Sequence, residues 1–327
     1  MNIAFCGLRH AHIYTLYELA SGRADVNIIG AWEESDPDRC AAQSRLTCPF
    51  YDSYYQLLAD ERVDIVAVGD YYGIRGQRVI DALKANKHVL CDKPICTRLE
   101  ELDEIERLCS EKHLFVGCML DLRYDPALRL AQKLITDGRL GEIHAINFTG
   151  QHPLQYGVRP MWYFESGKHG GTFNDLAVHG LDAIRYITGL EYRRTIKARQ
   201  YNAFAHQQPD FADCAQLLGE YQNGAGLVAD VSYSAPMPSA FSLPTYWRFS
   251  FWGEKGMLEC RLGEGQVTLA CEGMPHAQVI AAQPIDEDCL CDLILTIEGR
   301  PTAFLPNDAF IATRAALEIQ QAADQTQ

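Results

Sequence analysis

Three side chains in this sequence have the types and spacing needed to act together at one carbon atom. Lys93 ends an apolar run and precedes a proline, and Asp175 and His179 lie one helical turn apart after a pair of glycines. An imidazole accepts the proton of a hydroxyl group, a carboxylate orients the imidazole, and a fixed ammonium holds the reacting oxygen. This combination predicts the oxidation of an alcohol. On spacing alone, a surface Asp–His pair and a solvated lysine are the commoner explanation.

A second requirement follows, because no side chain accepts a hydride and a cofactor must do so. The N-terminus offers a site for a nicotinamide dinucleotide. Residues 1–7 form an apolar run that ends in Gly7, and a helical pattern covers residues 11–20. This order is typical of the first part of a βαβ nucleotide-binding unit. The glycine signature is degenerate, because Arg9 and His12 stand where its second and third glycines are usual.

Further apolar runs predict strands at residues 26–32, 63–69 and 88–91, with a helix over residues 77–86. Strands that alternate with helices form a parallel sheet, and its ligands bind beyond the carboxyl ends of the strands. Gly7, Glu34, Asp70 and Lys93 all fall at that edge in this interpretation.

The acidic pair Glu33-Glu34 follows the second expected strand, about where a carboxylate binds the adenosine ribose. Glu34 favours NAD, because its charge would repel a 2′-phosphate. Arg39 lies near enough in the sequence to keep NADP open. The alternative is that Glu33, Glu34 and Asp36 form only a solvated turn.

Composition excludes several classes of function. A formal net charge of −14 argues against binding to nucleic acid or to an anionic membrane. The sequence has neither a long apolar span nor a leader pattern, so we expect a cytoplasmic protein. The cysteines are scattered and predict reduced thiols. No metal site is expected, because Cys289-Leu-Cys291 has no second pair at zinc spacing and His10-Ala-His12 has no obvious carboxylate or thiol companion.

Two longer segments resemble the Gfo/Idh/MocA family, the glucose–fructose oxidoreductase and inositol dehydrogenase group. Residues 87–94, Lys-His-Val-Leu-Cys-Asp-Lys-Pro, are similar to the family's Gly-Lys-His-Val-(x)2-Glu-Lys-Pro stretch. Residues 170–182 are similar to its Gly-Gly-(x)3-Asp-(x)3-His segment. A third, shorter segment that carries the resemblance is Gln-Asn-Gly-Ala at residues 222–225, where a sheet hairpin is expected. The chain is identified as a member over nearly its whole length. It departs from the family at Asp92, where Glu is usual, and at residues 70–75, where a Thr-Pro-Asn-(x)2-His run is usual.

The resemblance implies an α/β protein with two domains. Residues 1–121 would form a dinucleotide-binding, Rossmann-like domain with a parallel sheet. Residues 122–327 would form an α+β domain with a large, mainly antiparallel open sheet that binds substrate and makes a homodimer or homotetramer. The sequence agrees, because residues 143–269 are rich in strand-favouring Tyr, Thr and Phe, and residues 307–323 have the pattern of a closing helix.

The resemblance also implies roles for individual residues. His179 would be the general base, Asp175 its orienting partner, and Lys93 the ligand of the reacting oxygen. The residues expected to contact NAD, or NADP, are Gly7, Arg9, His10, His12, Glu34, Asp70, Tyr71, Arg75, Asp92 and Lys93. Candidate substrate ligands are Arg123, His152 and Trp162, and the substrate would be a sugar, polyol or inositol.

Several alternatives stay open at this point. Arg9 either adds a cationic partner for the pyrophosphate or blocks its site. The same three catalytic residues would serve a redox-neutral lyase or glycoside hydrolase that uses bound NAD transiently. The family also includes regulatory proteins that keep the fold and sense a dinucleotide or sugar without catalysis.

Overall fold

The computed structural model describes residues 1–303, 305 and 308–325, which divide into two compact units. The first unit consists of Met1–Leu120, Pro160–Gly170 and Asp288–Thr313. The second consists of Asp121–Arg159, Gly171–Glu287 and Arg314–Gln327. Two segments from the later part of the chain therefore join the first unit, although the division expected at residue 121 does not assign them to it.

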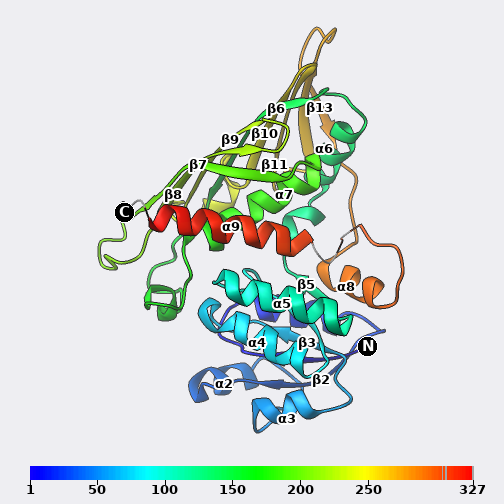
Figure 1. Ribbon diagram of the computed structural model, residues 1–327, viewed down its shortest axis with the longest axis vertical. Coiled ribbons are helices and arrows are strands. Elements are labelled where there is room, and N and C mark those ends of the chain that lie inside the picture. The colour runs from blue at the N-terminus through cyan, green and yellow to red at the C-terminus, as the bar shows by residue number, and fades with distance from the viewer. Residues whose placement is uncertain (304, 306–307, 326–327) are drawn as a thin grey trace. The chain divides into compact units, whose positions relative to one another are not determined.

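The first unit contains a five-stranded parallel sheet with the strand order β2-β1-β3-β4-β5. Strands β2, β3 and β5 of this sheet are labelled in Figure 1. Its strands are β1 (Asn2–Cys6), β2 (Asn27–Trp32), β3 (Ile65–Val68), β4 (His88–Cys91) and β5 (Val116–Cys118). Its helices are α1 (His12–Ser21), α2 (Asp36–Gln43), α3 (Tyr54–Ala59), α4 (Tyr72–Lys84), α5 (Leu99–Lys112), η2 (Met161–Phe164) and α8 (Cys289–Ile297). The parallel sheet expected from the sequence is thus confirmed.

The central strands are apolar on both faces. All four residues of β3 are buried, and β1 is buried from its second residue onward. Unbroken apolar runs of this kind are typical of parallel strands covered by helices on both faces. Helices α4 and α5 pack side by side (Figure 1). Helix α4 begins at Tyr72, earlier than expected, because Tyr71 already provides an extended N-cap.

The second unit contains an eight-stranded sheet with the order β13-β12-β11-β10-β6-β9-β8-β7. Its strands are β6 (Ile143–Gln151), β7 (Tyr192–Tyr201), β8 (Cys214–Tyr221), β9 (Gly226–Ser232), β10 (Arg248–Gly253), β11 (Gly256–Arg261), β12 (Gln266–Cys271) and β13 (Gln278–Ala281). Its helical elements are η1 (Asp121–Tyr124), α6 (Pro126–Thr136), η3 (Phe173–Ala177), α7 (Val178–Thr188) and η4 (Ala240–Ser242). The pairing is antiparallel except between β6 and β9, which confirms the mainly antiparallel sheet.

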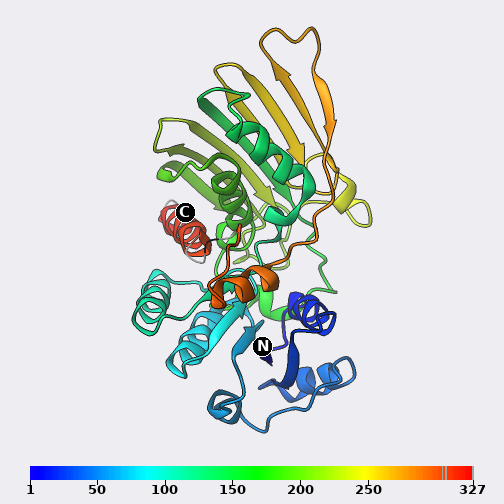
Figure 2. The same ribbon diagram turned by 90° about the vertical axis from the view of Figure 1, so that its right-hand side faces the viewer.

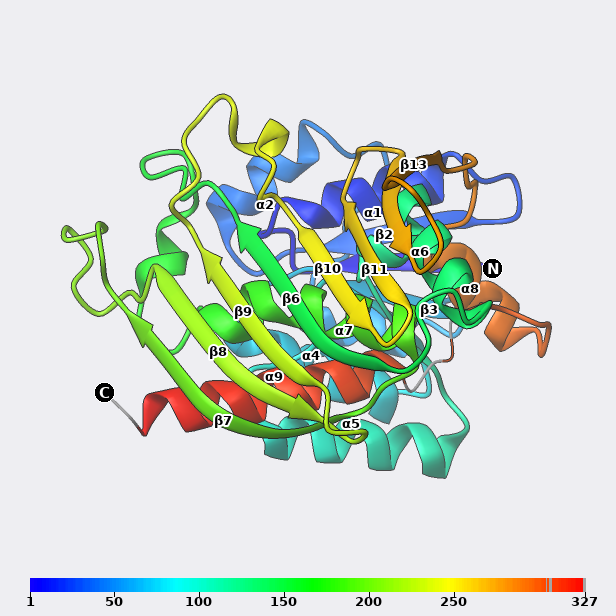
Figure 3. The ribbon, with the colours of Figure 1, turned by 90° about the horizontal axis from the view of Figure 1, so that it is seen from above.

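One face of this sheet carries the core of the second unit. Phe148 on β6 pairs with Phe249 on β10, and the ring of Phe249 stacks on that of Phe251. Helices α6 and α7 pack on the sheet (Figures 2 and 3). Helix α6 starts at Pro126, and the Asp125 side chain accepts hydrogen bonds from the first turn, so proline and cap agree on where the helix begins.

The last helix, α9 (Asp308–Asp324), agrees with the expected closing helix, although the expected first residue, Asn307, lies outside the described residues. Its residues from Arg314 belong to the second unit. Within the part of the chain that the structure describes, no helix is both long enough and apolar enough to span a bilayer.

Candidate active site

Gly7 forms the turn between β1 and α1. It has a φ of +71°, and a Cβ at this position would lie 2.5 Å from Asp70 Cβ, so the position requires glycine. Helix α1 follows with Ala11 as its N-cap, and no side chain among the described residues caps it. An uncapped helix N-terminus at the carboxyl end of a parallel strand is a place where phosphates bind.

Glu33, directly after β2, holds this turn in place. Its side chain is buried, and it accepts hydrogen bonds from the Leu8 backbone at 2.5 Å, from Arg9 Nε at 2.8 Å and from the Ser35 backbone at 2.8 Å. Glu33 is therefore not part of a solvated turn. Glu34 has a side chain that is 60% exposed and is the carboxylate left available to a ligand.

Two arginines converge on Glu34. Arg9 Nη2 and Arg78 Nη2 each lie 3.0 Å from Glu34 Oε2. Both guanidinium groups also lie near buried Asp70, with Arg9 Nε at 3.4 Å and Arg78 Nε at 3.3 Å. Burial raises the pKa of Asp70, while the charge of Arg9 acts in the opposite direction. Tyr71 packs under the Arg9 guanidinium. Sequence reasoning missed Arg78, which carries no motif signal.

Asp92, directly after β4, lies beside both histidines of the turn after β1. His10 Nδ1 contacts Asp92 Oδ2, and His12 Nδ1 lies 3.1 Å from Asp92 Oδ1. The expectation that His10 and His12 have no carboxylate companion is therefore wrong. Spacing along the chain could not reveal this companion, because only the strand order β1-β3-β4 brings the two segments together.

The His10–Asp92 pair is buried and differs in ionisation from the same groups in water. Burial lowers the pKa of His10 to about 3, so its ring is neutral. Burial alone would raise the pKa of Asp92, but its contacts with His10 and Arg75 hold it well below the ordinary value. The carboxylate is therefore ionised.

Three aromatic side chains surround the far side of the His10 ring. His10 Nε2 lies 3.0 Å from Tyr163 Oη and 3.2 Å from Tyr72 Oη. Trp162 stacks on Tyr163 with ring centroids 4.3 Å apart and donates a hydrogen bond to the Arg9 carbonyl at 3.4 Å. Trp162 thus packs on the turn after β1, within the first unit. Its role as a substrate ligand stays a prediction.

Arg75 fixes the backbone that carries Lys93. Its side chain is fully buried, and Nη1 donates to the carbonyls of Lys93 at 2.5 Å and Pro94 at 3.0 Å. Nη2 donates to the Asp70 carbonyl at 2.8 Å and to Asp92 Oδ2 at 3.0 Å. Lys93 itself is buried, with Nζ 5.8 Å from the ring centre of Tyr72. Arg75 therefore positions the strand end, and direct contact with a cofactor stays a prediction.

In the second unit, Asp175 lies in η3, a short π-helical turn that leads directly into α7. Its backbone amide donates to the Gly171 carbonyl at 3.0 Å, and Asp175 itself is buried. The hydroxyl of Tyr233 donates a hydrogen bond to Asp175 Oδ2. Sequence reasoning missed Tyr233, which lies just beyond β9 and outside the recognised segments.

His179, in the first turn of α7, is half-buried against Trp247, with ring centroids 5.1 Å apart. Trp247 has a φ of +44°, which is unusual for a bulky residue and often marks a functional site. Its ring packs over Gly150, where a Cβ would lie 2.5 Å from Trp247 Cζ3. Tyr246, the neighbour of Trp247, packs against His152, with ring centroids 6.3 Å apart.

The ring centroids of His152 and Tyr233 also lie 6.4 Å apart. Aromatic side chains therefore contact all three of these predicted residues: Tyr233 contacts His152 and Asp175, and Trp247 contacts His179. His152 Nδ1 lies 3.0 Å from the Pro153 carbonyl and 3.3 Å from Arg159 Nη2. The second unit therefore gathers three of the predicted site residues around Tyr233, Tyr246 and Trp247. That His152 binds substrate stays a prediction.

Arg123 makes a buried ion pair. Both Arg123 and Asp182 are buried, Arg123 Nε donates to Asp182 Oδ2 at 2.6 Å, and Nη2 donates to the other carboxylate oxygen. This bidentate arrangement joins η1 to α7. The role of Arg123 as a substrate ligand stays a prediction as well.

The predicted catalytic residues belong to different units. Lys93 lies in the first unit, and Asp175 and His179 lie in the second. Their convergence on one carbon atom therefore stays a prediction.

Comparison with known proteins gave matches in both halves of the chain. The family model described as the oxidoreductase family with an NAD-binding Rossmann fold matches residues 1–119, and the model of the GFO/IDH/MocA C-terminal domain matches residues 128–259. The uncharacterized oxidoreductase YrbE of Bacillus subtilis is 26% identical over 187 residues, which cover 56% of this chain and 52% of YrbE.

Two further proteins are similar to the chain. The myo-inositol 2-dehydrogenase of Thermotoga maritima is 30% identical over 143 residues, or 43% of this chain and 41% of that protein. The chain thus spans about half the length of the curated relatives it matches. A levoglucosan dehydrogenase, solved with NADH and levoglucosan, has a TM-score of 0.82 at 17% identity and covers 100% of this chain and 98% of its own. At that identity the likeness shows the fold alone.

Proposed function

The chain belongs to the Gfo/Idh/MocA family, and from this premise we propose that it is an oxidoreductase that transfers a hydride between NAD(P) and a hydroxyl-bearing carbon of a sugar, polyol or inositol. The names of its relatives support the substrate class, because they include a myo-inositol 2-dehydrogenase and a levoglucosan dehydrogenase. The observation that carries the proposal is that both units hold family residues with the required chemistry. Lys93 lies just beyond the carboxyl end of β4, Asp175 lies in η3, and His179 lies in the first turn of α7.

The residues of the first unit fit a dinucleotide. Gly7 keeps the tight turn that a Cβ would prevent, and the N-terminus of α1 offers amide groups with no side-chain cap among the described residues. Glu34 lies at the end of β2, with an exposed carboxylate suited to the ribose hydroxyls. Arg9 is drawn toward Glu33, Glu34 and Asp70, which supports an open phosphate site over a blocked one.

When bound, the nicotinamide would supply the hydride acceptor. The protein's own part is to bind the substrate hydroxyl and remove its proton. His179 would accept that proton, since a neutral imidazole is a base near neutral pH. Asp175, held by the Tyr233 hydroxyl, would place a fixed negative charge near the imidazolium that forms. Lys93, held by Arg75 through its own carbonyl, would donate a hydrogen bond to the reacting oxygen.

The test is the absorbance of reduced nicotinamide when the protein is mixed with NAD or NADP and a panel that includes myo-inositol and levoglucosan. Net formation of the reduced cofactor supports the dehydrogenase. Substrate conversion without net reduced cofactor would instead indicate the redox-neutral lyase or hydrolase. Tight dinucleotide binding without any conversion across a broad panel would favour the regulatory protein.

Glu34 provides a test of cofactor choice. We expect the protein to prefer NAD, and we expect Glu34→Ala to shift the preference toward NADP. The reason is that the substitution removes the repelling carboxylate and frees Arg9 and Arg78 to pair with a 2′-phosphate. Binding of both cofactors is measured by calorimetry, with Asp36→Ala as a control that removes a charge from the same turn. An unchanged preference in Glu34→Ala would contradict the assignment of Glu34 to the ribose.

We also propose that the outer face of the second sheet joins copies of this chain into a dimer or tetramer. Leu218 on β8 pairs with Val228 on β9, and both side chains are exposed, as is Trp252 on β10. Neighbouring exposed apolar side chains on one sheet face are typical of an interface. Light scattering at micromolar concentration should give a mass above that of one chain, and a monomeric mass would contradict this proposal.

A further inference from the structure

The turn after β1 and the end of β4 bring two imidazoles to one carboxylate. The candidate ligand atoms of His10, His12 and Asp92 all lie within 4.8 Å of one another. Each histidine approaches a different oxygen of Asp92, and the two rings meet edge to face with centroids 4.4 Å apart. His10 and Asp92 are buried, whereas the His12 side chain is 41% exposed, which leaves one side of the cluster open to solvent.

Groups outside the cluster hold its members in place. His10 Nε2 faces the hydroxyls of Tyr163 and Tyr72, at 3.0 Å and 3.2 Å. Arg75 Nη2 donates to Asp92 Oδ2 at 3.0 Å. Histidines that bind metals nearly always donate their second ring N–H to a neighbouring acceptor, and ligating carboxylates are themselves hydrogen-bonded. The cluster therefore has outer contacts of the kind that surround metal ligands.

We propose that His10, His12 and Asp92 bind a divalent transition-metal ion, in addition to the proposed oxidoreductase function. Two imidazoles and one carboxylate form the ligand set of zinc sites that keep an open position, and the same set suits other first-row ions such as Co²⁺. With both Nδ1 atoms bound to the ion, each ring would carry its proton on Nε2. The His10 proton would then point at a tyrosine hydroxyl, where a hydrogen-bond partner already lies.

The charge and the ligand types of the cluster determine which metal ions it should bind. Arg75 already binds one oxygen of Asp92, so the carboxylate attracts a further cation less strongly than a lone carboxylate would. Mg²⁺ and Ca²⁺ depend on several carboxylate or carbonyl oxygens, whereas Zn²⁺ and Co²⁺ bind imidazole nitrogen well. The site should therefore bind Zn²⁺ and Co²⁺ and should not bind Mg²⁺.

The experiment uses the full chain, freed of metal with a chelator, and no dinucleotide or substrate. Zn²⁺ binding is measured by calorimetry and Co²⁺ binding by visible absorbance. We expect one ion per chain and a cobalt spectrum without the sulfur-to-metal band that cysteine ligands give. Mg²⁺ should produce no binding heat. Because neither readout needs turnover, a negative result would leave the proposed oxidoreductase function untouched.

Two substitutions locate the ion. Tyr163→Phe removes an outer hydrogen bond and should weaken Zn²⁺ binding by about 10–100-fold, while His12→Ala removes a ligand and should weaken it more. His12 is partly exposed in the first turn of α1, so this variant should fold, which circular dichroism verifies. His276→Ala, on an exposed turn, is the control and should bind Zn²⁺ as the unaltered protein does.

Three results would overturn the proposal. They are no Zn²⁺ binding to the unaltered protein, a cobalt spectrum with a sulfur band that remains in His12→Ala, and equal Zn²⁺ affinity in His12→Ala and His276→Ala. The second would assign the ion to the cysteines, and the third to surface histidines.

Discussion

Replacing His179 with alanine is expected to lower the rate of hydride transfer by about 10²–10⁴-fold, the usual contribution of a positioned general base. Dinucleotide binding should survive, because His179 lies in the second unit and the groups that fit the dinucleotide lie in the first. Single-turnover formation of reduced cofactor measures the first quantity, and calorimetric titration with NAD measures the second. His276→Ala is the matched control, since it removes an exposed imidazole far along the sequence from α7.

The same measurement tests whether His179 and Lys93 act at one carbon. Groups that act as a unit lose most of their effect when either is removed, so the double variant should be little slower than the slower single variant. If the fold-reduction in rate of the double variant equals the product of the two single fold-reductions, the residues act independently. Near-normal turnover by His179→Ala would rule out the general-base role and favour the regulatory protein.

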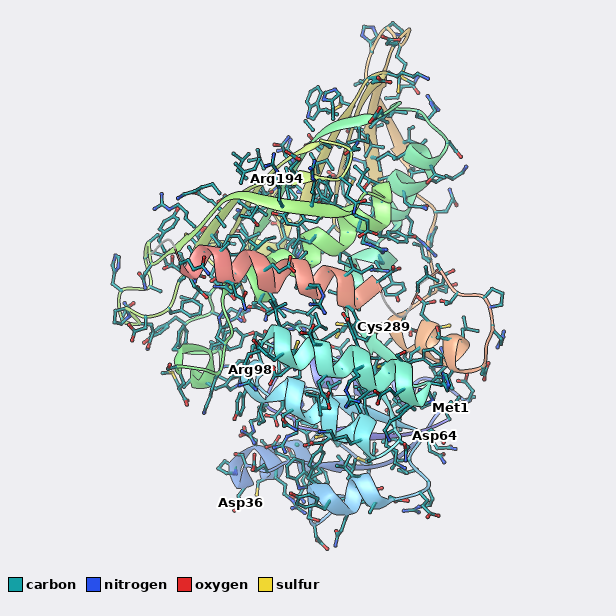
Figure 4. All side chains as sticks on the ribbon, viewed as in Figure 1. Met1, Asp36, Asp64, Arg98, Arg194 and Cys289 are labelled. Carbon is teal, nitrogen blue, oxygen red and sulfur yellow. The ribbon has the colours of Figure 1, made fainter. Side chains whose placement is uncertain are left out.

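The second large effect concerns stability. Arg123→Ala should lower the free energy of unfolding by about 3–5 kcal/mol, because it leaves the carboxylate of Asp182 buried without its partner. Urea denaturation followed by circular dichroism measures the change. Arg194→Ala is the control. Arg194 also pairs with a carboxylate, that of Glu220, but it lies exposed on β7 (Figure 4), and its removal should change stability little.

A double substitution separates the structural role of Arg123 from binding of substrate. Arg123→Met with Asp182→Leu removes both charges together and should recover most of the lost stability, since replacing a buried ion pair by apolar groups is often neutral. If the stable double variant keeps its KM, Arg123 does not bind substrate. If stability recovers and KM rises at least tenfold, Arg123 contacts the substrate as the sequence predicts.

The parallel sheet and the family could both be predicted from the sequence, because both depend on patterns that are continuous along the chain. The apolar runs of β1 and β3 are unbroken, and residues 87–94 and 170–182 each lie in one stretch. Strand β5 was missed because it has only three residues and gives no periodic signal.

Contacts between distant segments could not be predicted in the same way. Asp92 meets His10 only because β3 and β4 continue the sheet from β1 in that order. Tyr233 reaches Asp175 from the end of β9, and Trp247 reaches His179 from the start of β10, with no motif at either place. The sequence also could not show that Glu33 holds the turn after β1, because only burial distinguishes it from the neighbouring carboxylate of Glu34.

The π-helical turn η3 has a genetic consequence. A turn of this kind holds one residue more than an α-helical turn, so it is equivalent to a single inserted codon in a longer α-helix. Deleting one residue between Asp175 and His179 would restore regular winding and rotate Asp175 by about 100° about the helix axis relative to α7. Tyr233 would then lose its acceptor, while His179 would keep its place in α7. One in-frame deletion would thus displace the carboxylate that we propose orients His179 and leave the His179 imidazole in place.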